Sequence, residues 1–445
     1  MARGAACTIS ALVGCLLLPM TCAAQDVNWT LCRGGEGIKP EGQIAGCTAV
    51  IQSAGESRNN RAYAYFIRAY VFAAQRDFDR AIADLDQAIL LDPKLPDAYG
   101  NRGNAYRAKG NLDRAIADYS QMIAVAPNDP NGFNDRGNAY NEKREFDRAI
   151  SDLDQAIKLD PKFAWAYYNR GISYNNKGDQ DRAIADYSEA IRLDPTDAFF
   201  FNNRAKAYAD KNDFEHALAD YDRAIALDPK LALAFYNRGT DLRTMGELDR
   251  ALSDFDESIR LDPNYGPAYG NRARVWRDKG NPDHALADFG SSLRLSPGNK
   301  LDYFARGDVY FGKGEYEKAI ADYSEAIKLD PRYASALNNR CQARAIIGQL
   351  PDALNDCNES LKISPADAYT LDSRGFTHLK LGDFRAAIDD YSAALEINPK
   401  LASALYGRGI AKRRNGDASA AERDIAAAKD INHEIAEEFA RIGVQ

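Results

Sequence analysis

Apolar and small residues recur along this chain with the period of an α-helix. One face of a first predicted helix carries Tyr99, Arg102, Gly103 and Tyr106, at positions i, i+3, i+4 and i+7. A second helical face follows at Ala115, Tyr119 and Met122. The pattern therefore predicts a pair of helices, and the same pair returns through most of the sequence.

A proline ends each predicted pair of helices and recurs every 34 residues. The series is Pro93, Pro127, Pro161, Pro195, Pro229, Pro263, Pro297, Pro331, Pro365 and Pro399. The residue before a proline is disfavoured in a helix, so each proline stops the second helix of its pair. A repeat of this length indicates a stacked array, in which each unit buries its apolar face against its neighbours. We predict ten repeats over residues 62–401 and a degenerate eleventh over residues 402–435.

The turn between the paired helices has a register of its own. Most repeats place a glycine there: Gly110, Gly178, Gly246, Gly280, Gly314, Gly348, Gly382 and Gly416. Glycine suits the left-handed residue that ends a helix, and Asn212 can adopt the same conformation. Arg76 and Arg144 hold this register in two other repeats, where a left-handed backbone is costly.

The order of residue types within one repeat resembles that of tetratricopeptide repeats. The pattern is an aromatic residue, Gly103 and Tyr106 three residues on, then Ala115, the aromatic Tyr119 and Pro127, all on a 34-residue period. The resemblance covers residues 62–435. It implies an all-α, right-handed superhelical solenoid of about eleven helix-turn-helix repeats with terminal caps. It also implies that the first helices line a concave groove, which binds peptides or partner proteins.

The two ends of the chain differ from the repeats. Residues 1–24 have the pattern of a secretory signal, with Arg3, an apolar stretch and small residues before Gln25. An alternative is lipidation at Cys15, in a segment that resembles a bacterial lipoprotein box, which would give an outer-membrane lipoprotein. Residues 25–61 are expected to form a disulfide-containing N-terminal cap, or degenerate repeat, and residues 436–445 a C-terminal capping helix.

Four cysteines remain after the predicted signal, and they fall into two pairs. Cys32 and Cys47 flank a loop of the predicted cap, and Cys341 and Cys357 stand sixteen residues apart in one predicted hairpin. An even number of cysteines in an exported chain is typical of structural disulfides. We therefore expect both pairs to be bonded and the protein to be periplasmic or secreted.

Charge and motif content narrow the classes of function. The formal net charge is −8, and no basic stripe interrupts it, so nucleic acid is not an expected partner. The four histidines, His216, His284, His378 and His433, have no metal-ligand spacing. No nucleophile-elbow or phosphate-loop motif is present. We expect no catalytic residue, no metal, no cofactor and no small-molecule substrate.

Arginine occupies one register of all eleven first helices, and an aspartate follows each arginine sixteen residues later. Examples are Arg102 and Asp118, Arg170 and Asp186, and Arg238 and Asp254. Residues equidistant from the turn of an antiparallel hairpin lie level, so the two side chains are expected to meet. We interpret them as a ladder of partly buried ion pairs that fixes how hairpins stack. The alternative is a strip of arginines that binds phosphate or carboxylate groups.

A column of amides precedes the arginines and is the predicted peptide-binding site. It consists of Asn101, Asp135, Asn169, Asn203, Asn237, Asn271 and Asn339. An amide offers both a donor and an acceptor, so such a column can hold a peptide backbone. It resembles the asparagine ladder of the eukaryotic O-linked N-acetylglucosamine transferase, which implies binding of extended substrates. The alternative is that these amides brace neighbouring helices or are solvated.

Aromatic residues accompany the amides within residues 97–275, where we place the binding zone. They are Trp165, Tyr168, Phe199 and Tyr236. Such residues suit an extended, partly apolar segment, or they pack between repeats. The predicted function is a non-catalytic scaffold that binds proteins or peptides. Two alternatives remain: the substrate-recognition part of a separately encoded glycosyltransferase, and an outer-membrane lipoprotein of an assembly machine.

Overall fold

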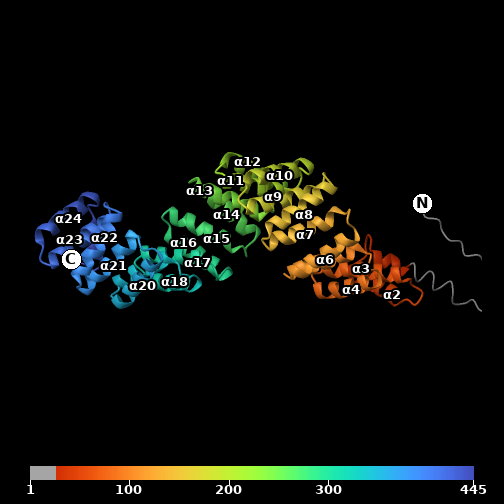
Figure 1. Ribbon diagram of the computed structural model, residues 1–445, viewed down its shortest axis with the longest axis horizontal. Helices are drawn as coiled ribbons and strands as arrows, with labels where there is room; N and C mark the ends of the chain where they lie inside the picture. The colour runs from red at the N-terminus through yellow and green to blue at the C-terminus, as the bar shows by residue number, and fades with distance from the viewer. Residues whose placement is uncertain (1–26, 445) are drawn as a thin grey trace, which may run out of the picture. The chain divides into compact units, whose positions relative to one another are not determined.

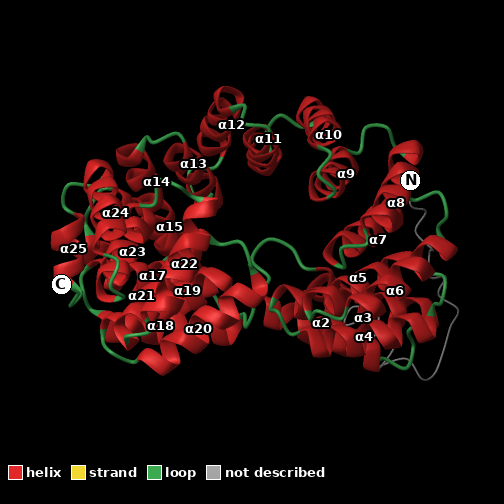
Figure 2. Ribbon diagram, turned by 60° about the vertical axis from the view of Figure 1, so that its left-hand side comes forward, coloured by secondary structure: helices red, strands yellow, loops and turns green. Residues whose placement is uncertain are grey.

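A computed structural model describes residues 27–444, and its regular elements are all α-helices. Figure 2 shows helices joined by short loops, with no strand among the described residues. The predicted signal segment 1–24 and the alternative lipid site at Cys15 lie outside the described residues. The all-α prediction is confirmed.

The helices alternate between a first and a second helix of each hairpin. The first helices are α3 (Arg58–Ala74), α5 (Pro96–Ala108), α7 (Pro130–Glu142), α9 (Ala164–Asn176), α11 (Ala198–Asp210), α13 (Ala232–Thr244), α15 (Gly266–Asp278), α17 (Lys300–Gly312), α19 (Ala334–Ile346), α21 (Ala368–Leu381) and α23 (Ala402–Arg414). The second helices are α4 (Phe78–Leu91), α6 (Leu112–Val125), α8 (Phe146–Leu159), α10 (Gln180–Leu193), α12 (Phe214–Leu227), α14 (Leu248–Leu261), α16 (Pro282–Leu295), α18 (Tyr316–Leu329), α20 (Leu350–Ile363), α22 (Phe384–Ile397) and α24 (Ala418–Ile431). A helical stretch over residues 27–33 and α2 (Pro40–Gln52) precede them, and α25 (Ile435–Arg441) follows.

The array divides into two compact units between Leu227 and Asp228. Within each unit the second helix of a hairpin packs against the first helix of the next one, as Figure 1 shows along the colour sequence. First helices of successive hairpins also contact one another, for example α7 with α9 and α19 with α21. No such contact joins successive second helices among the described residues. The first helices of each unit therefore lie on its inner, more closely packed side, which we call the inner face.

The hairpin turns use the left-handed backbone that the sequence predicts. Gly110 and Gly178 have φ of 77° and 82°, and Asn212 has φ of 62°. Arg76 and Arg144 adopt the same conformation, each with φ of 63°. Both arginines therefore accept a conformation that costs roughly 1–2 kcal/mol in a residue with a Cβ atom.

Small residues allow the two helices of a hairpin to approach closely. Ala115 of α6 is fully buried, as is the Tyr119 ring one turn later. A Cβ atom added at Gly103 of α5 would lie 2.7 Å from that ring, well inside van der Waals contact. The glycine and alanine registers are therefore packing positions, and the aromatic side chain fills the space between them.

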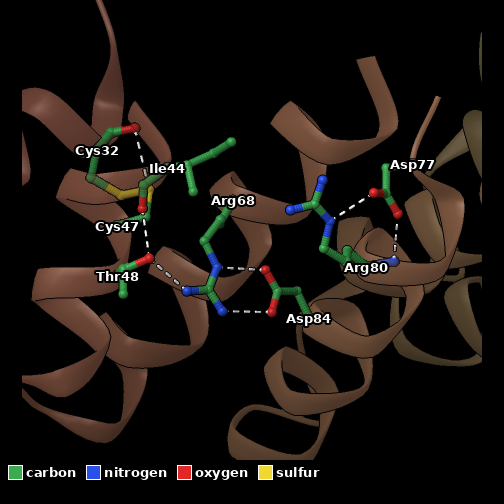
Figure 3. A network of polar contacts seen from close by, with 8 residues as sticks. All are labelled: Cys32, Ile44, Cys47, Thr48, Arg68, Asp77, Arg80 and Asp84. Carbon is green, nitrogen blue, oxygen red and sulfur yellow. Dashed lines mark hydrogen bonds and ion pairs between the residues drawn. A yellow bond between two sulfur atoms is a disulfide. The ribbon is translucent and has the colours of Figure 1, made fainter. Parts of the chain in front are cut away.

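The N-terminal cap is tied together by a disulfide. Cys32 and Cys47 are bonded and fully buried, and they join the stretch 27–33 to α2 (Figure 3). Thr48, beside Cys47, accepts a hydrogen bond from Arg68 Nη1 (2.7 Å) on α3, so the cap is also linked to the first full hairpin. None of the helices described is long and apolar enough to cross a membrane.

Candidate functional site

The arginine register forms bidentate ion pairs inside each hairpin. Arg170 of α9 donates from Nε and Nη2 to the two carboxylate oxygens of Asp186 on α10, at 2.8 and 2.7 Å. Arg102 and Asp118 make the same two contacts at 2.9 and 2.7 Å. Figure 3 shows the first member of the series, Arg68 with Asp84. The equivalent distances between Arg238 and Asp254 are 2.8 and 2.7 Å.

In most of these hairpins a third bond from the arginine reaches the preceding hairpin, and Arg306 is an exception. Arg170 Nη1 donates to Asp154 of α8 at 2.6 Å, and Arg204 Nη1 donates to Ser188 of α10 at 3.0 Å. Hydrogen bonding to Asp186 is the main cause that raises the pKa of Arg170. One guanidinium thus joins three helices, which its planar fork of donors suits well. These arginines are occupied, which disfavours the alternative of an anion-binding strip.

The amide column lies between successive first helices. Asn169 is buried, and its Nδ2 donates to Asn134 Oδ1 at 2.9 Å on the preceding first helix. Asn203 Nδ2 donates to the Tyr168 hydroxyl at 2.8 Å. In the second unit, Asn271 donates to the Tyr236 hydroxyl (2.9 Å) and Asn339 to Asp308 (2.9 Å).

The remaining members of the column are also close to neighbouring groups. Asp135 Oδ1 accepts from Asn134 Nδ2 at 3.2 Å, and burial raises the pKa of Asp135. Asn101 lies half-buried on α5, and Asn237 on α13 has an interaction partner of its own. Of the two interpretations of the column, the geometry favours bracing of neighbouring helices, because the amide donors of Asn169, Asn203, Asn271 and Asn339 are directed at the previous repeat.

Two of the predicted aromatic residues pack inside the array. Tyr168 is almost fully buried, with its ring 4.9 Å from that of Phe200 on the next first helix. Tyr236 contacts Tyr265 edge to face, with ring centroids 5.0 Å apart. Both hydroxyls accept the amide bonds described above. Their role in the structure is packing between repeats.

The other two predicted aromatic residues are exposed. Trp165 is 42% exposed, and its ring lies edge to face on Tyr168 (5.3 Å) and on Phe200 (5.2 Å). Phe199, in the same register one repeat later, is 43% exposed. Trp165 and Phe199 are the second residues of α9 and α11, so each side chain is fixed in the first turn of a first helix. Each offers apolar surface that no other part of the described chain covers.

This register is apolar and exposed in six repeats, which the sequence analysis did not recognise. Its exposed members are Tyr63, Trp165, Phe199, Leu233, Leu301 and Tyr369. Each lies a multiple of 34 residues from the others. The signal was available in the sequence, because a column read from Trp165 in steps of 34 finds every one of them. We call these six residues the apolar register.

Two buried acceptors on first helices lack a partner. Asn175 Oδ1 on α9 and Asn338 Oδ1 on α19 have no hydrogen bond among the described residues. Buried amide oxygens are normally satisfied, so these two are exceptions to the usual pairing. No group of three or more histidine, cysteine or acidic side chains within residues 27–444 is arranged to hold a metal ion.

The chain was compared with protein families and known structures. Models described as "TPR repeat" match residues 137–178, 205–240, 307–345 and 375–416. Models described as "Tetratricopeptide repeat" match residues 67–132, 164–197 and 236–300. No curated protein matches the chain.

Solved structures with related helical arrays include three named proteins. The APC/C hetero-tetramer Cut9-Hcn1 is 15% identical, with 96% of this chain and 98% of that chain covered and a TM-score of 0.46. PilF of Pseudomonas aeruginosa is 20% identical, with 46% and 94% covered and a TM-score of 0.44. YrrB, described as a TPR protein with an unusual peptide-binding site, is 25% identical, with 42% and 97% covered and a TM-score of 0.34.

Proposed function

Because this chain belongs to the tetratricopeptide repeat family, we propose that it is a non-catalytic scaffold that binds an extended, partly apolar segment of a partner protein on its inner face. The observation that carries the proposal is the apolar register. Exposed large apolar side chains normally occur singly on a soluble surface, whereas six of them here occupy one structural position. A partner segment that contacts the starts of several first helices would account for this shared position.

The strongest part of the proposed site is the pair Trp165 and Phe199. The two rings lie in the first turns of consecutive first helices of one unit, so a ligand that lies across α9 and α11 can contact both. Aromatic anchors of this kind supply much of the binding energy of protein interfaces. The amide column itself has a bracing role in this proposal and holds the anchors in place.

Export is the second part of the proposal. Two bonded, fully buried cysteine pairs are typical of an oxidising compartment. A periplasmic or secreted scaffold therefore fits the chain. The mass of the mature N-terminus tests this: a start at Gln25 supports a cleaved signal, and a lipid mass on Cys15 supports the outer-membrane alternative.

The inner face is tested by site-specific crosslinking in cells. A photoreactive phenylalanine analogue replaces Phe199, and a matched analogue replaces Leu159, which is 37% exposed at the end of the second helix α8. We expect partners to be captured from position 199 and not from position 159. With a purified partner, Trp165→Ala and Phe199→Ala are each expected to weaken binding about tenfold, whereas Leu159→Ala leaves it unchanged. Equal capture from both positions would show that the inner face is not the binding surface.

A further inference from the structure

The C-terminal helix α25 lies over the inner face of the last repeats. Its Phe439 ring contacts Tyr406 of α23 (centroids 4.9 Å apart) and also Phe376 of α21 (6.2 Å). Phe376 lies on α21, the first helix of the hairpin that precedes the hairpin of α23. α25 therefore packs on both helices of the last hairpin, α23 and α24, and through Phe439 it also reaches α21.

One side of residues 435–444 makes apolar contacts, and the other side is exposed to solvent. Ile435, Phe439 and Val444 are buried in a cluster with Phe376, Leu379, Leu405 and Ile410. Lys380 Nζ adds a hydrogen bond to the Ile442 carbonyl at 3.5 Å. On the opposite side, Glu437, Glu438 and Arg441 are exposed. The segment 435–444 therefore binds this part of the chain as a short amphipathic helix binds a groove of another protein.

Basic residues lie beside the end of this segment, where Lys380 and Arg414 line a hollow together with Gly443 and Val444. The last turn of α21 carries Lys380, and the last turn of α23 carries Arg413 and Arg414. The first turn of α25 carries Glu437 and Glu438. The glutamates face solvent, so the apolar contacts of Ile435, Phe439 and Val444 hold the segment on α21 and α23.

We propose that residues 435–444 are a displaceable internal ligand, and that the apolar site they occupy on α21 and α23 is a recognition site for a short amphipathic helix of a partner protein. The partner helix would carry a phenylalanine with an aliphatic residue four positions before it and another three positions after it, as Ile435, Phe439 and Ile442 do. The site lies in the unit that begins at Asp228, and it takes a ligand different from the extended segment proposed for α9 and α11. It does not depend on binding there.

The covalent link between residues 435–444 and the array explains why this site stays occupied in the absence of a partner. A segment joined by a short linker has an effective concentration on the order of millimolar, so a free ligand at micromolar concentration competes poorly. Weakening the internal contact removes this advantage. The Phe439→Ala variant of the full chain is therefore expected to open the site.

The probe is a fluorescent peptide with the sequence of residues 432–445. We expect Phe439→Ala protein to bind it with at least tenfold higher affinity than the unaltered protein, as measured by fluorescence anisotropy. The same peptide with alanine in place of phenylalanine is the matched control and is expected not to bind. Glu437→Ala protein, altered on the outward side, is expected to behave like the unaltered chain. A folded Phe439→Ala protein that does not bind the peptide would overturn the proposal.

A second measurement uses the unaltered chain and requires no variant to fold. Amide hydrogen exchange of residues 435–444 is expected to be at least a hundredfold faster than that of α23 and α24, because the segment opens on its own. Exchange as slow as in α23 would show a permanent part of the core and would refute displacement. Crosslinking from position 199 is unaffected by either result, so failure here is distinguishable from failure of the proposed function.

Discussion

Arg170 and Asp186 form a bidentate ion pair across one hairpin, with both oxygen contacts shorter than 2.9 Å. The aspartate is buried, so removal of the arginine leaves a charge without a partner. We expect Arg170→Ala to lower the free energy of unfolding by about 3–5 kcal/mol in urea denaturation. Adding Asp186→Ala to this variant is expected to restore part of the loss. Equal stability of Arg170→Ala and the unaltered chain would mean that the pair contributes nothing.

Arg306 shows the same pairing with Asp322 but lacks the third acceptor. Its register partner on the preceding second helix is Gly290, where other hairpins carry Ser188 or Ser324. A Cβ atom at Gly290 would meet nothing within 4 Å. Gly290→Ser is therefore expected to stabilise the protein by about 1–2 kcal/mol, from helix propensity and one new hydrogen bond to a charged group.

Gly290→Ala is the matched control for that variant. It supplies the same improvement in helix propensity without the hydroxyl acceptor. The serine variant is expected to exceed the alanine variant in denaturation midpoint once their different helix propensities are subtracted. If serine gives no advantage after that correction, Arg306 Nη1 makes no use of an acceptor at this position.

Asp372 gives the protein a predicted pH dependence. Burial raises the pKa of Asp372 to about 7, although the hydrogen bond from Ser403 Oγ (2.8 Å) opposes the shift. The unfolded chain has the ordinary aspartate pKa of about 3.9. Between these two values the folded state holds the extra proton, so stability falls as pH rises from about 4 to 7.

Asp372→Asn removes that titration. Its unfolding free energy is expected to vary less between pH 5 and pH 8 than that of the unaltered chain, with the larger gain at pH 8. Urea denaturation at the two pH values measures the difference. Other carboxyl groups with raised pKa, such as Asp308, are present in both proteins and cancel in the comparison. Parallel pH profiles would contradict the assignment to Asp372.

The buried Cys341–Cys357 bond links α19 to α20. Cross-linking residues sixteen apart restricts the unfolded chain and is expected to contribute about 3 kcal/mol. Denaturation with and without a thiol reductant measures this contribution. Cys32→Ala with Cys47→Ala provides the comparison, because that change removes only the bond of the N-terminal cap. A mass that does not change on reduction would show that neither pair is bonded.

Contacts within one repeat could be predicted from the sequence, whereas contacts between two repeats could not. The pairing of Arg102 with Asp118 follows from equal distances to a turn, so one hairpin suffices to predict it. The partner of Asn203 is the Tyr168 hydroxyl of the preceding first helix, and that contact depends on how hairpins rotate against each other. The same rotation leaves Trp165 exposed while Tyr168, three residues on, is buried.

The sequence predicted that a left-handed backbone is costly at Arg76 and Arg144, but it did not predict that both residues adopt this conformation. Arg76 and Arg144 adopt the left-handed turn in spite of their side chains, because the helices on both sides require it. Asp77 N and Glu145 N each complete this turn by donating to a carbonyl of the first helix, at 2.9 Å. Hydrogen bonds and packing of the hairpin together outweigh a local preference of about 1–2 kcal/mol.

The missing side-chain acceptor at Gly290 affects how the second unit unfolds. Stacked repeats unfold together only as far as each one is coupled to its neighbour. In this unit Arg272, Arg340, Arg374 and Arg408 each donate a hydrogen bond to the preceding second helix, whereas Arg306 on α17 donates none to α16. Cooperativity within the second unit is therefore expected to be lowest there, and under force or heat this unit is expected to separate first at this junction.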